Sequence, residues 1–179
     1  HYVFKDRRQK KDKVLTYNVI GYLIGNDEKL KDEFVVIGGH YDTTANAPGK
    51  INNGADDNAS GTSMVIELFE KFAATNNHKR TLVFMAFGGE ELGLLGSKYF
   101  VNNPTIDLEK VHLMVNLDMI GRMEDNNVQL GGAATAENFS SRLHPFLMEE
   151  NVNVIAVSYT HLRAHETDSY LVCRLLLEK

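Results

Sequence analysis

The sequence is almost without cysteine: in 179 residues, Cys173 is the single thiol. One cysteine excludes an internal disulfide framework, and it also excludes a zinc site built from cysteine ligands. We find no internal repeat and no low-complexity linker. With 43% hydrophobic and 24% charged residues, the composition instead suits one globular domain with a sizeable core.

An excess of positive charge and a long apolar run are missing as well. The formal net charge is −5, so we expect no nucleic-acid partner. Basic residues gather only in Lys5–Lys13, which we interpret as a solvated connector. No apolar stretch approaches the roughly 18 residues of a transmembrane helix, so we expect no membrane span. No signal peptide opens the chain, which begins at His1 without a methionine, and we expect a piece of something longer.

Apolar strands alternate with amphipathic helices along the chain. The patterns predict strands at 17–25, 33–42, 81–87, 111–120, 127–132 and 152–158, and helices at 60–76, 92–103 and 136–151. Ser60 is the expected N-cap of the first helix. Such alternation indicates βαβ units, so the predicted fold is α/β, with a mostly parallel mixed sheet flanked by helices. Ligands of such sheets bind at the carboxyl ends of the strands.

Potential metal ligands occur where four of these elements begin or end: His40 with Asp42, Asp56 with Asp57, Glu90 with Glu91, and Asp118. A single acidic residue at a strand end is usually a turn or cap residue, but four such segments at one sheet edge need another explanation. Carboxylates gathered so closely repel each other strongly unless cations lie among them. Histidine with carboxylates suits zinc, with cobalt and manganese as alternatives, and one carboxylate can bridge two ions.

The adjacent carboxylates of Glu90 and Glu91 are expected to have different roles. Successive side chains that leave a strand point in different directions, so the two should not serve the same ion. One would ligate a metal, and the other would take a proton from a bound water and pass it to a leaving amine. The residues alone leave open which glutamate does which.

Four motifs, "GGHYDT", "NGADDNASG", "FGGEELGLLGS" and "NLDMIG", resemble in order and spacing those of the M28 family of zinc peptidases. The match runs from about Tyr17 to Val157. The resemblance implies the zinc-aminopeptidase (phosphorylase/hydrolase-like) fold, a peptide or protein substrate, and two zinc ions per site. It implies an aminopeptidase that removes N-terminal residues, in a secreted or periplasmic protein. The preferred side chain, the metal identity and the oligomeric state stay open.

The resemblance also assigns the ligands of both zinc ions. It implies that His40 and Asp118 ligate the first zinc, that Asp57 bridges the two, and that Glu91 ligates the second. It makes Glu90 the proton shuttle.

Two further features are implied around these ligands. Asp42 would hold the imidazole of His40 through its other nitrogen. The peptide bond between Asp57 and Asn58 would be cis.

The resemblance implies one more ligand, a histidine on the second zinc. In the family it lies well beyond the position of Asp118, and we expect this chain to end before it. We therefore expect residues 1–157 to be the N-terminal part of an M28 peptidase domain. Residues 158–179 resemble translated adaptor read-through, and we expect them to be a non-native tail. The chain itself should then be inactive and hold at most one ion weakly. The alternatives are a carboxypeptidase or one-zinc glutaminyl-cyclase-like acyl transferase on this fold, or a non-catalytic interaction domain.

Overall fold

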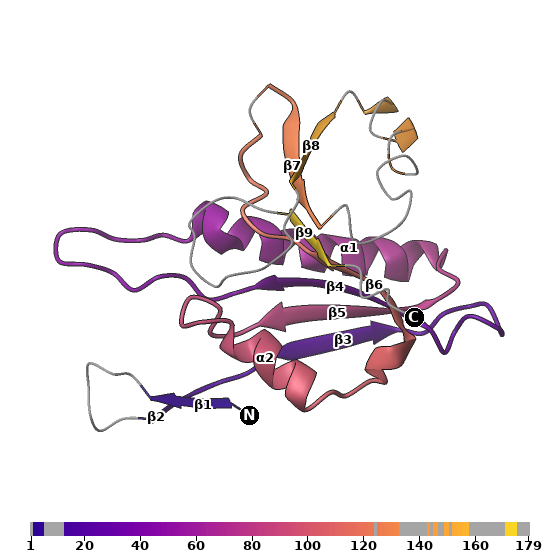
Figure 1. Ribbon diagram of the computed structural model, residues 1–179, viewed down its shortest axis with the longest axis horizontal. Coiled ribbons are helices and arrows are strands. Elements are labelled where there is room, and N and C mark those ends of the chain that lie inside the picture. Colours follow the sequence, from indigo (N-terminus) through magenta and orange to yellow (C-terminus); the bar gives the residue numbers. More distant parts are fainter. Residues whose placement is uncertain are drawn as a thin grey trace.

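The computed structural model describes residues 2–5, 13–123, 125–132, 143, 145–146, 149–150, 152–157 and 171–174. These residues form a seven-stranded sheet in the order β3-β5-β4-β6-β9-β7-β8. Its strands are β3 (Val19–Leu23), β4 (Phe34–His40), β5 (Thr81–Phe87), β6 (Val111–Asn116), β7 (Asn127–Gly131), β8 (Asn153–Val157) and β9 (Leu171–Arg174). Figure 1 shows a long helix against one face of the β3-β5-β4 part and a shorter helix against the other.

Most strand pairs in this sheet are parallel. β4 runs parallel to both of its neighbours, β5 and β6, and β7 runs parallel to β8 and β9. Among the described strands of this seven-stranded sheet, only β3 against β5 and β9 against β6 are antiparallel. The predicted α/β fold with a mostly parallel mixed sheet is confirmed. The sheet also includes β9, whose residues belong to the segment that we expected to be a non-native tail.

The helices cover the two faces of the sheet. α1 (Gly61–Thr75) and α2 (Leu95–Asn102) confirm two of the predicted helices with slightly shorter bounds. Short helical segments precede α1 at η1 (Ala55–Ser60) and β6 at η2 (Leu108–Lys110). The predicted helix at 136–151 lies mostly outside the described residues. Within the part of the chain that is described, no helix is long and apolar enough to cross a bilayer.

A separate hairpin replaces the connector expected near the start of the chain. β1 (Tyr2–Lys5) pairs antiparallel with β2 (Lys13–Thr16), and Figure 1 shows this pair projecting from the main sheet. The ends of the basic run therefore lie in strands, which we did not predict. The residues between them fall outside the described part.

Two apolar layers cover β4 and β5, one on each face. Phe84 of β5 is buried toward α1, where its ring meets Phe69 edge-on at a centroid distance of 5.3 Å. Val83 and Met85 point to the opposite face and pack with Phe100 of α2. Alternation along a strand produces this division. Because both faces are covered, the central strands hold their carboxyl ends in fixed positions.

The register of the central strands brings their carboxyl ends to one edge. His40 at the end of β4 is paired with Phe87 at the end of β5, and Gly38 is paired with Asn116 at the end of β6. The predicted ligands follow these strand ends or lie in η1, at the start of α1. The parallel pairing therefore positions the candidate site.

Candidate metal centre

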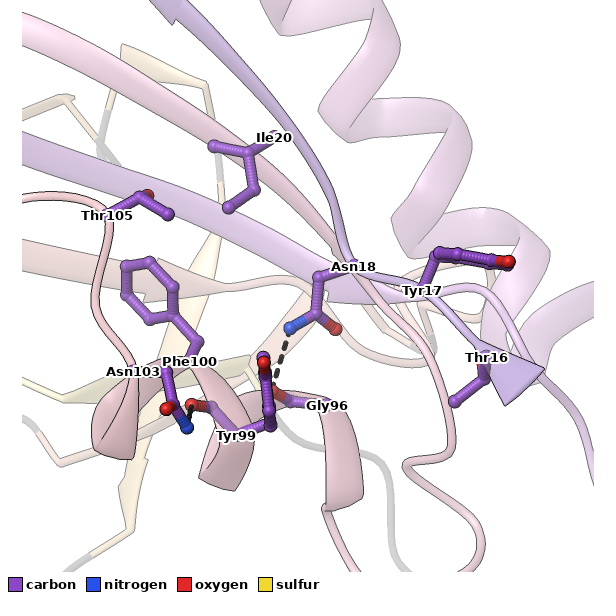
Figure 2. Close-up of a pocket in the computed structure, with 9 residues that line it drawn as sticks. All are labelled: Thr16, Tyr17, Asn18, Ile20, Gly96, Tyr99, Phe100, Asn103 and Thr105. Atoms are coloured by element: carbon purple, nitrogen blue, oxygen red, sulfur yellow. Dashed lines mark hydrogen bonds between the residues drawn. The ribbon is translucent and has the colours of Figure 1, made fainter. Parts of the chain in front are cut away.

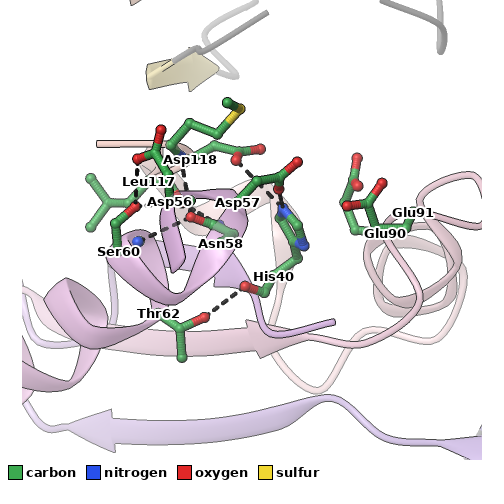
Figure 3. A network of polar contacts seen from close by, with 12 residues as sticks. His40, Asp56, Asp57, Asn58, Ser60, Thr62, Glu90, Glu91, Leu117 and Asp118 are labelled. Atoms are coloured by element: carbon green, nitrogen blue, oxygen red, sulfur yellow. Dashed lines mark hydrogen bonds and ion pairs between the residues drawn. The ribbon is translucent and has the colours of Figure 1, made fainter. Parts of the chain in front are cut away.

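Three of the predicted ligands meet at this edge. Nε2 of His40 lies 3.1 Å from Oδ1 of Asp57 and 3.4 Å from Oδ1 of Asp118, and one ligand atom from each residue lies within 4.8 Å of the others (Figure 3). Ligands bonded tetrahedrally to zinc at 2.0–2.1 Å are themselves roughly 3.3 Å apart. The separations from the imidazole therefore match the size of a zinc ion.

His40 is oriented by backbone contacts. The residue is only 2% exposed, and its Nδ1 lies 3.0 Å from the carbonyl oxygen of Asp42. A carbonyl can only accept, so Nδ1 carries the proton and Nε2 faces the carboxylates. Thr62 in α1 donates to the carbonyl oxygen of His40 at 2.6 Å. Asp42 was expected to hold this imidazole; its carbonyl is the nearer group, since its carboxylate Oδ1 lies 3.7 Å from Nδ1.

The carboxylate of Asp42 instead holds the segment with the two glutamates. Its Oδ1 accepts from the backbone N–H of Glu90 at 3.0 Å, and its Oδ2 accepts from that of Glu91 at 3.2 Å. β5 ends at Phe87, and Gly89 has a φ of 73° that favours glycine. The two glutamates therefore lie in a turn, and the expectation that strand alternation separates them was wrong. The tight turn is the reason: the strand ends before it reaches them.

Glu90 and Glu91 lie outside the three-residue ligand group, but Figure 3 shows their carboxylates on the same side of the sheet edge as Asp57. Oε1 of Glu91 is buried, and no described group donates a hydrogen bond to it. A buried carboxylate oxygen without a donor is costly, and a cation removes that cost. The position of Glu91 therefore suits a metal ligand.

The charges of the site perturb one another strongly. Burial alone would lower the pKa of His40, but hydrogen bonds to Asp118 and Asp42, together with the charges of Asp118 and Glu90, raise the pKa to about 11. Burial, and then the negative charges of Asp57 and Glu90, raise the pKa of Glu91 to about 7. Burial likewise raises the pKa of Glu90 and of Asp57. Without metal, the site therefore binds protons in place of cations.

Sequence reasoning missed the buried residue at the centre of this arrangement, Asn58, which is 2% exposed. The expected cis peptide between Asp57 and Asn58 is confirmed. Ser60 occupies the predicted cap position, but its hydroxyl makes no cap hydrogen bond and donates back to the carbonyl oxygen of Asp56. The density of polar residues in "NGADDNASG" was the available signal for these contacts.

A pocket of about 230 Å³ lies elsewhere, between β3 and α2 (Figure 2). Asn18 in its wall donates to the carbonyl oxygen of Gly96 at 2.8 Å and accepts from the N–H of Gly88 at 3.2 Å. It thereby ties α2 to the end of β5. None of the predicted site residues lines this pocket.

Comparison with known sequences gives the family. The profile of peptidase family M28 matches residues 18–169. The chain belongs to peptidase family M28. Aminopeptidase YwaD of Bacillus subtilis is 37% identical to this M28 chain over 105 residues, which are 58% of the chain and 22% of YwaD. A protein named probable zinc metalloprotease, from Pyrenophora teres f. teres, is 35% identical over 135 residues, or 69% of the chain and 28% of that protein.

Comparison with solved structures supports the fold of this M28 chain. LapB from Legionella pneumophila superposes with a TM-score of 0.63 at 21% sequence identity. The match covers 96% of this chain and 46% of LapB. The chain spans less than half the length of each of these three proteins.

Proposed function

We propose that the protein is an aminopeptidase that uses two zinc ions to hydrolyse N-terminal residues from peptides. The observation that carries this proposal is the convergence of His40, Asp57 and Asp118 at separations that fit zinc. The membership in family M28 and the names of the relatives support the reaction class and the metal. When bound, zinc polarises a substrate carbonyl and makes a bound water more acidic.

Five of the predicted site residues have a role in this proposal. His40 and Asp118 would hold the first ion, Asp57 would contribute to both ions, and Glu91 would hold the second with its buried oxygen, to which no described group donates a hydrogen bond. Glu90 takes the proton of the attacking water and delivers it to the leaving amine. Burial raises the pKa of Glu90 above that of an ordinary glutamate, which favours proton transfer near neutral pH.

The proton shuttle is tested by Glu90→Gln in the longest form of the protein that its gene encodes. We expect hydrolysis of an aminoacyl reporter to fall by about 10²–10⁴-fold, with the zinc content unchanged. Glu67→Gln, at an exposed position of α1, is the matched control. Near wild-type turnover by the Glu90 variant with metal bound would contradict the role of Glu90. Cyclisation of an N-terminal glutamine, without release of amino acids, would favour an acyl transferase instead.

The 179-residue chain itself is proposed to be inactive and to hold at most one ion, weakly. Among the described residues, Asp57 and Glu91 are the two proposed ligands of the second ion, and two carboxylates leave its coordination incomplete. Zinc stoichiometry measured by atomic emission should not exceed one per chain. Robust hydrolysis by this chain that a chelator abolishes would contradict the proposal.

A further inference from the structure

Asn58 connects the segments that carry two of the proposed ligands. It follows Asp57 in η1, and its Nδ2 donates to the carbonyl oxygen of Leu117 at 3.0 Å. Its Oδ1 accepts from the N–H of Met119 at 3.2 Å. Leu117 and Met119 are the two chain neighbours of Asp118. One buried amide therefore holds the backbone on both sides of Asp118.

Two further side chains of η1 hold the next residues of the same loop. Ser60 accepts from the N–H of Ile120 at 3.1 Å while it donates to the carbonyl oxygen of Asp56 at 2.6 Å. Oδ1 of Asp56 accepts from the N–H of Gly121 at 2.8 Å. Together with Asn58, these residues accept hydrogen bonds from the three consecutive backbone N–H groups that follow Asp118. None of these amides belongs to a described strand, so the side chains replace the sheet as their partner.

The loop also packs directly on the backbone of the helix start. Oδ1 of Asn58 accepts a further hydrogen bond from the N–H of Gly61 at 3.0 Å. A Cβ at Gly61 would collide with the carbonyl oxygen of Leu117, and one at Gly39 would lie 2.9 Å from the same oxygen. Glycine at both positions allows this close approach. The loop after β6 is therefore fixed against η1, α1 and β4.

We propose that Asp56, Asn58 and Ser60 are positioning residues that set the carboxylate of Asp118 opposite His40 before metal binds. The proposal rests on the metal centre proposed above. Ordering a free loop costs roughly 1–2 kcal/mol per residue in backbone entropy. If these side chains bear that cost during folding, the metal does not have to, and metal affinity rises without any new ligand.

The test uses Ser60 and Asp56, because the removal of Asn58 would leave buried backbone groups unpaired and unfold the chain. Ser60→Ala removes the acceptor of the Ile120 amide, and Asp56→Ala removes that of the Gly121 amide. Asp56→Asn keeps a side-chain oxygen for this amide and serves as the conservative rescue. Ser97→Ala is the matched control, since the hydroxyl of Ser97 only donates within its own helix turn, to Leu94 at 3.3 Å.

Two measurements on the full chain decide the proposal. In the metal-free protein, hydrogen exchange across residues 119–121 should accelerate in both alanine variants and not in the control. Zinc affinity, measured by competition with a chromophoric chelator, should fall by about 10–100-fold in the same variants. Asp56→Asn should remain close to the unsubstituted protein in both.

The outcomes separate this inference from the proposed function. Zinc affinities equal to that of the unsubstituted protein would overturn the positioning role, whether or not exchange accelerates. Unchanged exchange would overturn it as well, because the loop would then be held by other contacts. An unsubstituted chain that binds no zinc would overturn the proposed metal centre itself.

Discussion

The two sides of the candidate metal centre are held in different ways. His40 and Asp118 belong to segments that are fastened by buried groups, with Asn58 at 2% exposure between them. Glu90 and Glu91 lie in a turn whose two N–H groups bind the carboxylate of a single residue, Asp42. One side is part of the packed interior, and the other is a turn held at its backbone.

The difference suggests a division between a fixed ligand cluster and a turn whose two glutamate N–H groups both bind one side chain. Asp42 connects the two, because its carbonyl oxygen accepts from the imidazole of His40 and its carboxylate accepts from the turn. The accepted hydrogen bonds and the partner His40 also lower the pKa of Asp42, although burial alone would raise it. The charge that holds the turn is therefore stable in the folded protein.

The largest expected effect is the loss of metal from the fixed ligand cluster. Asp57→Ala removes the carboxylate 3.1 Å from Nε2 of His40, and we expect zinc binding to fall to background. Hydrolysis by the longest natural form should drop by more than the 10–100-fold that is typical for loss of a ligand's hydrogen-bond partner. Asp32→Ala, at an exposed position, is the control. Zinc retained at full stoichiometry in the Asp57 variant would refute the assignment.

Loss of the Asp42 carboxylate, which holds the turn, should lower turnover more than it lowers metal binding by the fixed cluster. Asp42→Ala keeps the carbonyl oxygen that orients His40 but removes both acceptors of the turn. In the longest natural form, we expect kcat to fall by about 10–100-fold. In the 179-residue chain, the single zinc ion should be retained. Asp42→Asn keeps one acceptor oxygen and should be intermediate. Equal losses of zinc and of turnover in Asp42→Ala would show that the two sides are not separately held.

A smaller effect is expected in the pH dependence of the free energy of unfolding, measured on the metal-free protein. The folded pKa of His40, about 11, lies above its ordinary 6.5, so its contribution to stability is present below pH 6.5 and is lost as the pH rises toward 11. The folded pKa of Glu91, about 7, also lies above its ordinary 4.5. The folded state therefore binds more protons than the unfolded state, and the free energy of unfolding should fall as the pH rises.

Urea unfolding in the presence of a chelator, at pH values from 5 to 9, measures this trend. Glu91→Gln removes one of the two groups and should flatten the fall between pH 4.5 and 7. A stability that increases from pH 5 to pH 9 would contradict the raised values.

The smallest expected effect concerns the contact between α1 and β4 behind the site. Thr62→Val removes the hydrogen bond to the carbonyl oxygen of His40, which should lower the free energy of unfolding by about 1 kcal/mol. Thr75→Val, whose hydroxyl donates to the exposed end of the same helix, should change it less. Equal effects of the two substitutions in urea unfolding would show that the contact at His40 has no special weight.

Much of the fold follows from local pattern. The apolar run "TLVFMAF" predicts β5 at its observed bounds, because a strand covered on both faces needs continuous apolar residues. The helix predicted at 60–76 is found as α1, because its apolar residues recur at helical spacing. The pair of strands β1 and β2 was missed, because each strand has only four residues and the basic residues of Lys5–Lys13 favoured a connector.

The site shows the limit of such reasoning more sharply. The sequence places His40, Asp57 and Asp118 near strand or helix ends, and parallel pairing alone then brings them to one edge. It gave the wrong reason for the separation of Glu90 and Glu91, because a turn at Gly88–Gly89 intervenes. It placed Ser60 correctly at the helix cap, but it did not predict that the hydroxyl accepts from the loop after β6.

The sequence by itself determined the chemical types of the ligands, the strands that carry them and, through four motifs, the family. Tertiary structure decided which oxygen or nitrogen each polar side chain contacts: the carboxylate of Asp42 on the turn, and the amide of Asn58 on the loop after β6. The physical reason is range. Periodicity reflects which face of an element is buried, whereas hydrogen bonds between segments some 60 residues apart depend on how the sheet packs.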